Sequence, residues 1–288
     1  MAKKISKIKE NLETKQKQFI FNSSVPRSGS QLFQCVLNQN PRFFASGTSG
    51  LIELVYSVKN QFSALPEIKS ADWLEDRDLV LKNTLNGLME GFYQDKDKEF
   101  ICDKSRGWIY YYPLTSFALG YKPKLICMVR DLRAVFASFE KIYRKNPQSF
   151  HEVDQPNKMI GLTVGSRVNY WSKTPPIGLA IERLKDALFR GQGQDFIFIR
   201  YEDFIQNPQN EMNEFYESLG VEPFQHDFEN IVSIAEDDRF HHISDLHTVK
   251  PKIEPLKFDH KEILGDAICK GIIEDYKWFY EAFYPEKI

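Results

Sequence analysis

Short apolar runs alternate with amphipathic stretches along most of the chain. The apolar runs predict strands at residues 18–25, 100–102, 124–129 and 195–199. Apolar side chains at helical spacing predict helices at residues 32–39, 51–62, 79–93, 132–143, 157–171, 177–190, 208–219 and 263–283. Because run 124–129 is apolar throughout, it is typical of a parallel strand covered on both faces. The alternation indicates an α/β fold with a mainly parallel central sheet flanked by helices.

The composition is that of a globular protein with a sizeable core. The chain has 288 residues, of which 42% are hydrophobic and 27% charged. Residues 1–18 hold six lysines and two glutamates, so we expect a basic N-terminal arm at 1–17, followed by a single domain over 18–288 with helical insertions. Apolar residues at positions 5, 8 and 12 allow a surface helix in the arm, but a solvated terminus is favoured.

Charge and cysteine usage exclude several classes of protein. A formal net charge of -2 argues against a broad nucleic-acid-binding surface, so an anion site has to be local. The four cysteines form no CxxC pair, which predicts free thiols and a cytoplasmic location. We expect no transmembrane segment, because no stretch reaches about 18 uninterrupted apolar residues.

A first candidate anion site lies between the first predicted strand and the helix after it. The residues there are Ser24-Val-Pro-Arg-Ser-Gly-Ser-Gln31. Backbone N–H groups at such a turn attract phosphate or sulfate, Gly29 permits a tight bend, Ser28 and Ser30 add hydroxyl donors, and Arg27 adds a fixed charge. The ATPase pattern GxxxxGK[ST] is absent, which disfavours a kinase that depends on a metal ion.

A second candidate anion site follows strand 124–129. Arg130 ends that strand, Asp131 can cap the next helix, and Ser138 lies about two turns into it. Two anion pockets at the carboxyl ends of parallel strands favour a nucleotide with phosphates on two parts of its ribose.

These motifs resemble those of the sulfotransferase family, which uses 3'-phosphoadenosine 5'-phosphosulfate (PAPS). Residues 25–30 resemble the 5'-phosphosulfate loop, and 129–138 the 3'-phosphate motif. The chain looks most similar to tyrosylprotein-sulfotransferase-like and bacterial-type members. Further matches are Asn40-Pro41, Asp103-Lys104, Arg200-Tyr-Glu-Asp-Phe204 and His247-Thr-Val-Lys-Pro251. The resemblance implies a P-loop NTPase-like three-layer fold and a sulfotransferase that moves a sulfuryl group from PAPS to a hydroxyl or amine without a metal ion.

The resemblance also implies roles for individual residues. Arg27 and Lys104 would neutralise charge on the transferring group, and Arg130 and Ser138 would hold the 3'-phosphate. Tyr201 would contact this phosphate or the adenosine, and Lys250 would close over the nucleotide. Residues 28–31 would complete the cofactor site, with the amide of Gln31 donating where the family usually has a second hydroxyl.

The general base is less clearly marked. In the resembling tyrosylprotein enzymes an acidic residue follows Asn-Pro closely, but residues 45–50 contain no carboxylate. Glu53 is the first candidate, and Asp103 and His247 remain open. The histidines and aspartates of 237–247 match no zinc-ligand spacing, so a polar loop is favoured over a metal site. Tyr110-Tyr-Tyr112 is interpreted as core packing, although it could stack on an acceptor ring.

Two alternatives to a sulfotransferase stay open. One is a kinase-like phosphotransferase, and the other is a non-catalytic nucleotide-binding relative that has lost its base. The acceptor is open too, with a small molecule, glycan, lipid or peptide as candidates. Segments 54–99 and 145–195 are expected to form its walls, but no motif in them identifies it.

Overall fold

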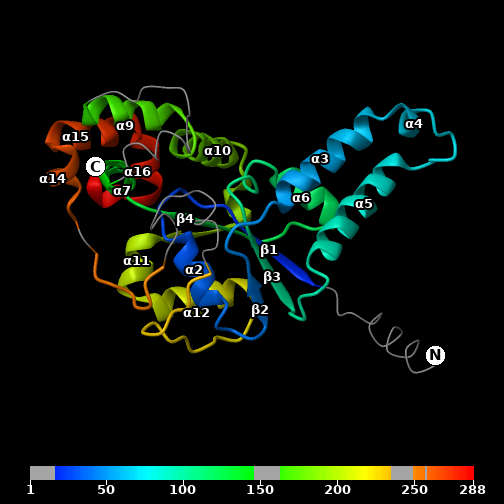
Figure 1. Cartoon of the computed structure of the whole chain (residues 1–288), viewed down its shortest axis with the longest axis horizontal. Coiled ribbons are helices and arrows are strands. Elements are labelled where there is room, and N and C mark those ends of the chain that lie inside the picture. Colours follow the sequence, from blue (N-terminus) through cyan, green and yellow to red (C-terminus); the bar gives the residue numbers. More distant parts are fainter. Residues whose placement is uncertain (1–16, 146–162, 235–248, 257) are drawn as a thin grey trace.

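A computed structural model describes residues 17–145, 163–234, 249–256 and 258–288. Its five strands form one parallel sheet in the order β2-β3-β1-β4-β5 (Figure 1). The strands are β1 (Gln18–Asn22), β2 (Phe43–Ala45), β3 (Phe100–Lys104), β4 (Leu125–Val129) and β5 (Phe196–Arg200). All five carboxyl ends therefore lie along the same edge of the sheet.

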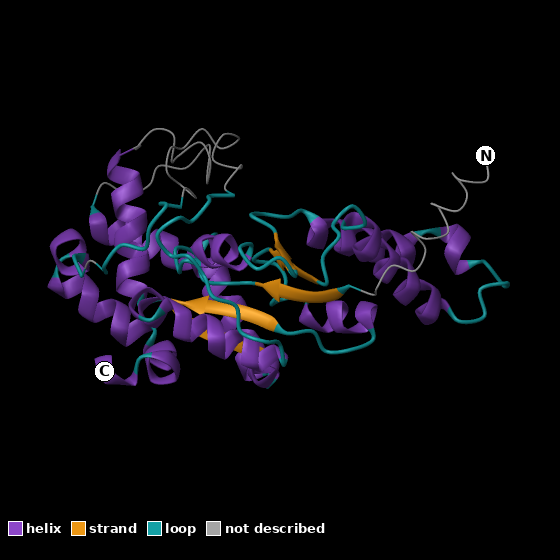
Figure 2. Cartoon of the chain, turned by 90° about the horizontal axis from the view of Figure 1, so that it is seen from below, coloured by secondary structure: helices purple, strands orange, loops and turns teal. Residues whose placement is uncertain are grey.

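Helices connect the strands and cover both faces of the sheet (Figure 2). They are α2 (Ser30–Leu37), α3 (Leu51–Ala64), α4 (Pro66–Lys69), α5 (Arg77–Phe92), α6 (Tyr112–Leu119), α7 (Leu132–Lys145), α9 (Val164–Lys173), α10 (Ile177–Phe189), α11 (Tyr201–Gln206), α12 (Pro208–Leu219), α14 (His260–Leu264), α15 (Asp266–Asp275) and α16 (Lys277–Phe283). Two 3-10 turns, Gln192–Asp195 and Pro285–Lys287, complete the described elements. Figure 1 shows α3, α4 and α5 extending away from the sheet as a helical arm.

Alternating residues of β4 separate the two hydrophobic clusters of the core. Leu125, Cys127 and Val129 belong to the larger cluster, with side chains from α3, α5, α7, α10 and α16. Ile126 and Met128 belong to the second, with side chains from α2, α11 and α12. Both faces of the central strands are thus apolar, which explains the uninterrupted apolar run in the sequence. The architecture is the predicted three-layer α/β arrangement.

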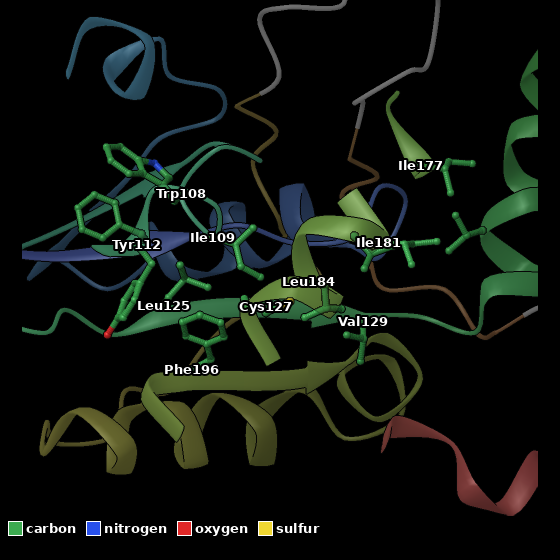
Figure 3. Close-up of a cluster of buried hydrophobic side chains, with 14 of the residues drawn as sticks. Trp108, Ile109, Tyr112, Leu125, Cys127, Val129, Ile177, Ile181, Leu184 and Phe196 are labelled. Carbon is green, nitrogen blue, oxygen red and sulfur yellow. The ribbon is translucent and has the colours of Figure 1, made fainter. Parts of the chain in front are cut away.

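Helix α10 is fixed to the sheet by one face only. Its Ile177, Ile181 and Leu184 are at most 3% exposed and pack in the cluster that contains Cys127 and Val129 (Figure 3). Residues at the intervening helical positions consequently face away from the sheet. This anchoring matters for the site below, because the opposite face of α10 forms part of its wall.

The four predicted strands are confirmed, whereas the short strand β2 was not predicted, because three residues carry too little pattern. The prediction of one terminal helix over 263–283 is wrong. Gly265, with a φ of 86°, separates α14 from α15, and Tyr276 separates α15 from α16. The apolar spacing continues across both breaks, so it does not reveal them. In the described part of the chain, no helix is both long and apolar enough to cross a membrane.

The packing of α10 predicts unequal effects of two leucine truncations. Leu184 is 1% exposed, whereas Leu179 on the same helix is 36% exposed. Leu184→Ala should lower the free energy of unfolding by about 2–5 kcal/mol, because it leaves a cavity against the sheet. Leu179→Ala is the control and should cost well under half as much. Urea unfolding of both variants checks this, and equal losses would contradict the described packing.

Candidate active site

A cavity of about 1000 Å³ lies along the carboxyl edge of the sheet. Its walls come from the segments that follow β1, β3, β4 and β5, from the first two turns of α3 and α10, and from residues 249–256 and Asp259. Of the predicted site residues, Arg27, Gly29, Ser30, Gln31, Glu53, Lys104, Arg130, Ser138, Tyr201 and Lys250 line it. Side chains far apart in the sequence thus meet in one place.

The turn between β1 and α2 has a left-handed backbone. Arg27 has a φ of 62° and Gly29 a φ of 84°. Ser28 closes the turn, since its N–H and its hydroxyl both donate to the carbonyl oxygen of Val25, at 3.3 and 2.6 Å. Ser28 is fully buried, so the hydroxyl predicted to bind the ligand instead holds the shape of the turn.

The turn and the segment after β4 are joined by two hydrogen bonds. Arg27 Nε donates to Ser138 Oγ at 3.0 Å, and Arg130 Nη1 donates to the carbonyl oxygen of Arg27 at 2.9 Å. The sequence predicted two separate anion pockets, whereas the structure makes them adjacent. Arg27 and Arg130 therefore concentrate positive charge at one end of the cavity.

Tyr201 packs between the turn and Arg130. The Arg130 guanidinium lies 4.3 Å from the centroid of the Tyr201 ring, a cation–π contact. A Cβ placed on Gly29 would lie 2.5 Å from Tyr201 Cδ2, so no larger residue fits there without displacing the ring. The first residue of α11 thus sets both the orientation of Arg130 and the close approach of the turn.

Gln31 presents a buried amide to the cavity. It is 8% exposed, and neither its Nε2 nor its Oε1 has a hydrogen-bond partner among the described residues. Arg130 Nε is likewise buried without a partner in the described part of the chain. Because buried polar groups are almost always paired in proteins, these donors fit a site that receives an oxygen-rich ligand.

The segment behind Arg130 is fixed by a buried carboxylate. Asp131 accepts hydrogen bonds from Arg133 Nη2 at 2.6 Å, Tyr280 Oη at 2.9 Å and Lys287 Nζ at 2.9 Å. Burial alone would raise its pKa, but the hydrogen bonds from Arg133 and Lys287 hold the pKa of Asp131 well below its usual range. It also caps α7 through the Arg133 N–H at 3.0 Å, as predicted. The C-terminal segment thereby supports the position of Arg130.

Glu53 and Lys104 reach the cavity from α3 and β3. Glu53 is exposed in the first turn of α3, which starts where Ser49 Oγ accepts the N–H of Leu51 at 2.9 Å. Lys104 ends β3, and its N–H donates to Ser46 Oγ at 2.9 Å. Both side chains line the cavity, so the structure brings together the two residues predicted as base and as cation.

Asp103, an alternative base, is placed elsewhere. It is fully buried, accepts Trp108 Nε1–H at 2.6 Å and the Tyr93 hydroxyl, and does not line the cavity. Burial raises the pKa of this carboxyl. Since successive strand residues point to opposite sides, Asp103 supports the floor of the site while Lys104 faces the cavity.

Lys250 lines the cavity at an exposed position and pairs with Glu254 at 2.6 Å. His247, the third candidate base, and the histidines at 241 and 242 lie outside the described residues. In the described ranges, no group of three or more His, Cys, Asp or Glu side chains is arranged to hold a metal ion. All four cysteines are free and buried, as predicted.

The sequence did not single out the cavity residues Tyr56, Arg106 and Arg183, and it interpreted a fourth, Tyr111, mainly as core packing. They come from α3, from the segment after β3 and from α10. A polar residue on an amphipathic helix has the same spacing whether it faces water or a cavity. The sequence therefore does not distinguish Arg183 from an ordinary surface arginine. The run of three tyrosines was noticed, but only the structure separates buried Tyr112 from Tyr111 on the cavity wall.

The chain was compared with known proteins. A model described as "Sulfotransferase family" matches residues 20–226. Sulfotransferase STF9 from Mycobacterium avium is similar with a TM-score of 0.51 at 13% identity, over 98% of this chain and 81% of that one. A sulfotransferase domain from the curacin biosynthetic pathway has a TM-score of 0.45 at 18% identity, covering 86% and 96%. The sulfotransferase from Alicyclobacillus acidocaldarius has 0.44 at 14%, covering 90% and 96%. No curated protein sequence matched.

The contact between Gly29 and Tyr201 predicts a severe effect of a single methyl group. Gly29→Ala combines a positive φ with a Cβ 2.5 Å from the ring, and should destabilise the protein by about 1–3 kcal/mol. Gly87→Ala is the control, because nothing lies within 4 Å of its Cβ and it sits inside α5, where alanine should stabilise by up to about 1 kcal/mol. Thermal unfolding of both variants tests this prediction. A Gly29→Ala protein as stable as the wild type would contradict the close contact with Tyr201.

Proposed function

This chain belongs to the sulfotransferase family, and we propose that it transfers the sulfuryl group of PAPS to a hydroxyl group of an acceptor. The observation that carries the donor assignment is the cluster of Arg27, Arg130 and Ser138 at one end of a cavity lined by Gln31. A donor with a 3'-phosphate and a 5'-phosphosulfate requires adjacent anion sites of this kind.

Different residues of the cluster bind different parts of this donor. Arg130 and Ser138 bind the 3'-phosphate, with the guanidinium oriented by the Tyr201 ring. The N-terminus of α2 and the Gln31 amide bind the 5' end, where helix N–H groups and the helix dipole favour negative charge. Arg27 belongs to the turn before α2 and donates a hydrogen bond to Ser138, so it lies between the two sites.

PAPS supplies an activated sulfuryl group, and the chain's own residues position the reacting groups and neutralise their charge. In the transfer, the acceptor oxygen bonds to sulfur while the bond from sulfur to the bridging phosphate oxygen breaks, and the electron pair stays on the phosphate. Glu53 takes the proton of the acceptor hydroxyl. Lys104 lines the same cavity and stabilises the negative charge that builds up on the bridging oxygen.

The donor assignment predicts that PAP, the desulfonated product, stabilises the protein. At about 100 times its dissociation constant, PAP should add about 2.7 kcal/mol to the free energy of unfolding, seen as a rise in melting temperature. Arg130→Ala should abolish this rise. Arg190→Ala is the control, since Arg190 pairs with Asp186 on the surface and does not line the cavity. No rise at millimolar PAP would overturn the donor assignment.

The base assignment predicts a loss of turnover without a loss of binding. Glu53→Gln removes the proton acceptor and should lower kcat by about 10²–10⁴-fold, with the PAP-induced rise in melting temperature unchanged. Glu67→Gln serves as the control, because Glu67 lies in α4, away from the cavity. Transfer of labelled sulfate from PAPS to acceptors is measured, and wild-type turnover in Glu53→Gln would show that another group is the base.

A further inference from the structure

Where α3, the segment after β3 and α10 meet at the cavity, neighbouring side chains form a series. Glu53 and Tyr56 lie one turn apart on α3. The Tyr56 ring centroid lies 4.9 Å from that of Tyr111, which lies 4.9 Å from that of Tyr110. The guanidinium of Arg183, from α10, lies 5.5 Å from the Tyr110 centroid. The proposed base, an aromatic platform and a cation therefore follow one another in this series.

Arg183 is held in the same manner as Arg130. Its Nη1 donates to the carbonyl oxygen of Arg106 at 3.2 Å and its guanidinium faces a tyrosine ring. Neither arginine forms an ion pair with a carboxylate in the ranges that the structure describes. Both line the cavity, Arg130 after β4 and Arg183 from α10. Carbonyl and ring partners orient a guanidinium without neutralising its charge, so each arginine fits an anion.

Part of the cavity wall is apolar. Ile52 lies one turn before Tyr56 on α3, and Pro175, Pro176 and Leu179 line the cavity at the start of α10. Tyr56 is 41% and Leu179 36% exposed, which leaves large apolar surfaces facing the cavity. Such surfaces favour a flat aromatic ring, because its apolar faces gain from stacking on the tyrosines and from burial against the prolines and Leu179.

We propose that the acceptor is an aromatic hydroxyl compound that carries an anionic group, such as a hydroxyaryl carboxylate. The hydroxyl lies at Glu53, the ring lies between the tyrosines and the apolar wall, and the anion binds Arg183. This assignment rests on the proposed function, since it names the acceptor of that same site. Arg183 is then a specificity residue for the acceptor and has no part in binding the donor.

Two matched acceptors test the proposal. One is 3-(4-hydroxyphenyl)propanoate, and the other is its amide, which has the same ring and hydroxyl but no charge. With PAPS and labelled sulfate, kcat/KM should be about tenfold or more higher for the acid, because a charged hydrogen bond is lost with the amide. In parallel, each acceptor is added to the PAP-saturated protein, and the acid should raise the melting temperature further than the amide.

Variants on α10 show whether Arg183 causes the preference. Arg183→Gln should bring the acid-to-amide ratio of kcat/KM close to one, mainly through the KM of the acid, and Arg183→Lys should restore part of it. Lys185→Gln is the control on the same helix, since Lys185 faces Trp278 and does not line the cavity. A purely structural role of Arg183 would lower both rates together and leave the ratio unchanged.

The outcomes separate this inference from the proposed function. Equal rates for acid and amide, a ratio that Arg183→Gln leaves unchanged, or transfer only to a sugar or alkyl alcohol would overturn the inference and leave the sulfotransferase standing. If neither compound accepts sulfate and neither shifts the PAP-saturated protein, the inference is likewise overturned. Failure of PAP itself to bind would instead overturn the proposed donor.

Discussion

Parallel pairing of all five strands is the constraint on which the rest of the molecule depends. With β1 between β3 and β4, the central strands have no solvated face, so every crossing helix contributes an apolar side to one of two clusters. The same pairing places every strand's carboxyl end on one edge. Arg27, Lys104, Arg130 and Tyr201 therefore meet, although they are separated by up to 174 positions in the sequence. The site follows from the topology, and its chemistry follows from which residues occupy the first positions after each strand.

Arginines held by neutral partners distinguish this cavity from an ordinary charged surface. An arginine paired with a carboxylate has its charge compensated, and an incoming anion has to displace that partner. Arg130 and Arg183 are each oriented by one carbonyl oxygen and one tyrosine ring, so their charge stays directed at the cavity. The supporting groups matter as much as the arginines. The Asp131 network fixes the segment behind Arg130, and the burial of Ile181 and Leu184 fixes the helix that carries Arg183.

The sequence predicted those features whose signals are local. The turn at 24–31 and the segment 130–138 could be found because an anion site between a strand and a helix needs particular residues at fixed short spacings. The contact of Arg27 with Ser138 could not be found, since 111 positions separate the two residues and only the folded sheet brings them together. Asp103 was a candidate base because the sequence shows only that a carboxylate lies at the end of a strand. The sequence does not show whether that carboxylate faces solvent or, as here, binds buried Tyr93 and Trp108. The terminal helix was predicted as continuous because tertiary packing, and not apolar spacing, decides where it breaks.

The cations that line the cavity differ in their partners, which the net charge of -2 does not show. Lys141, Lys250 and Lys252 each pair with a carboxylate, on Asp259, Glu254 and Glu229. Such partly exposed pairs are worth roughly 0–1 kcal/mol, so exchanging the carboxylate for a phosphate costs little. These lysines can thus adjust to a ligand, whereas Arg130 and Arg183 are already oriented. In the proposed function, the oriented charge of Arg130 attracts the nucleotide and that of Arg183 attracts the acceptor. Lys250 and Lys252 can then rearrange around the bound ligand.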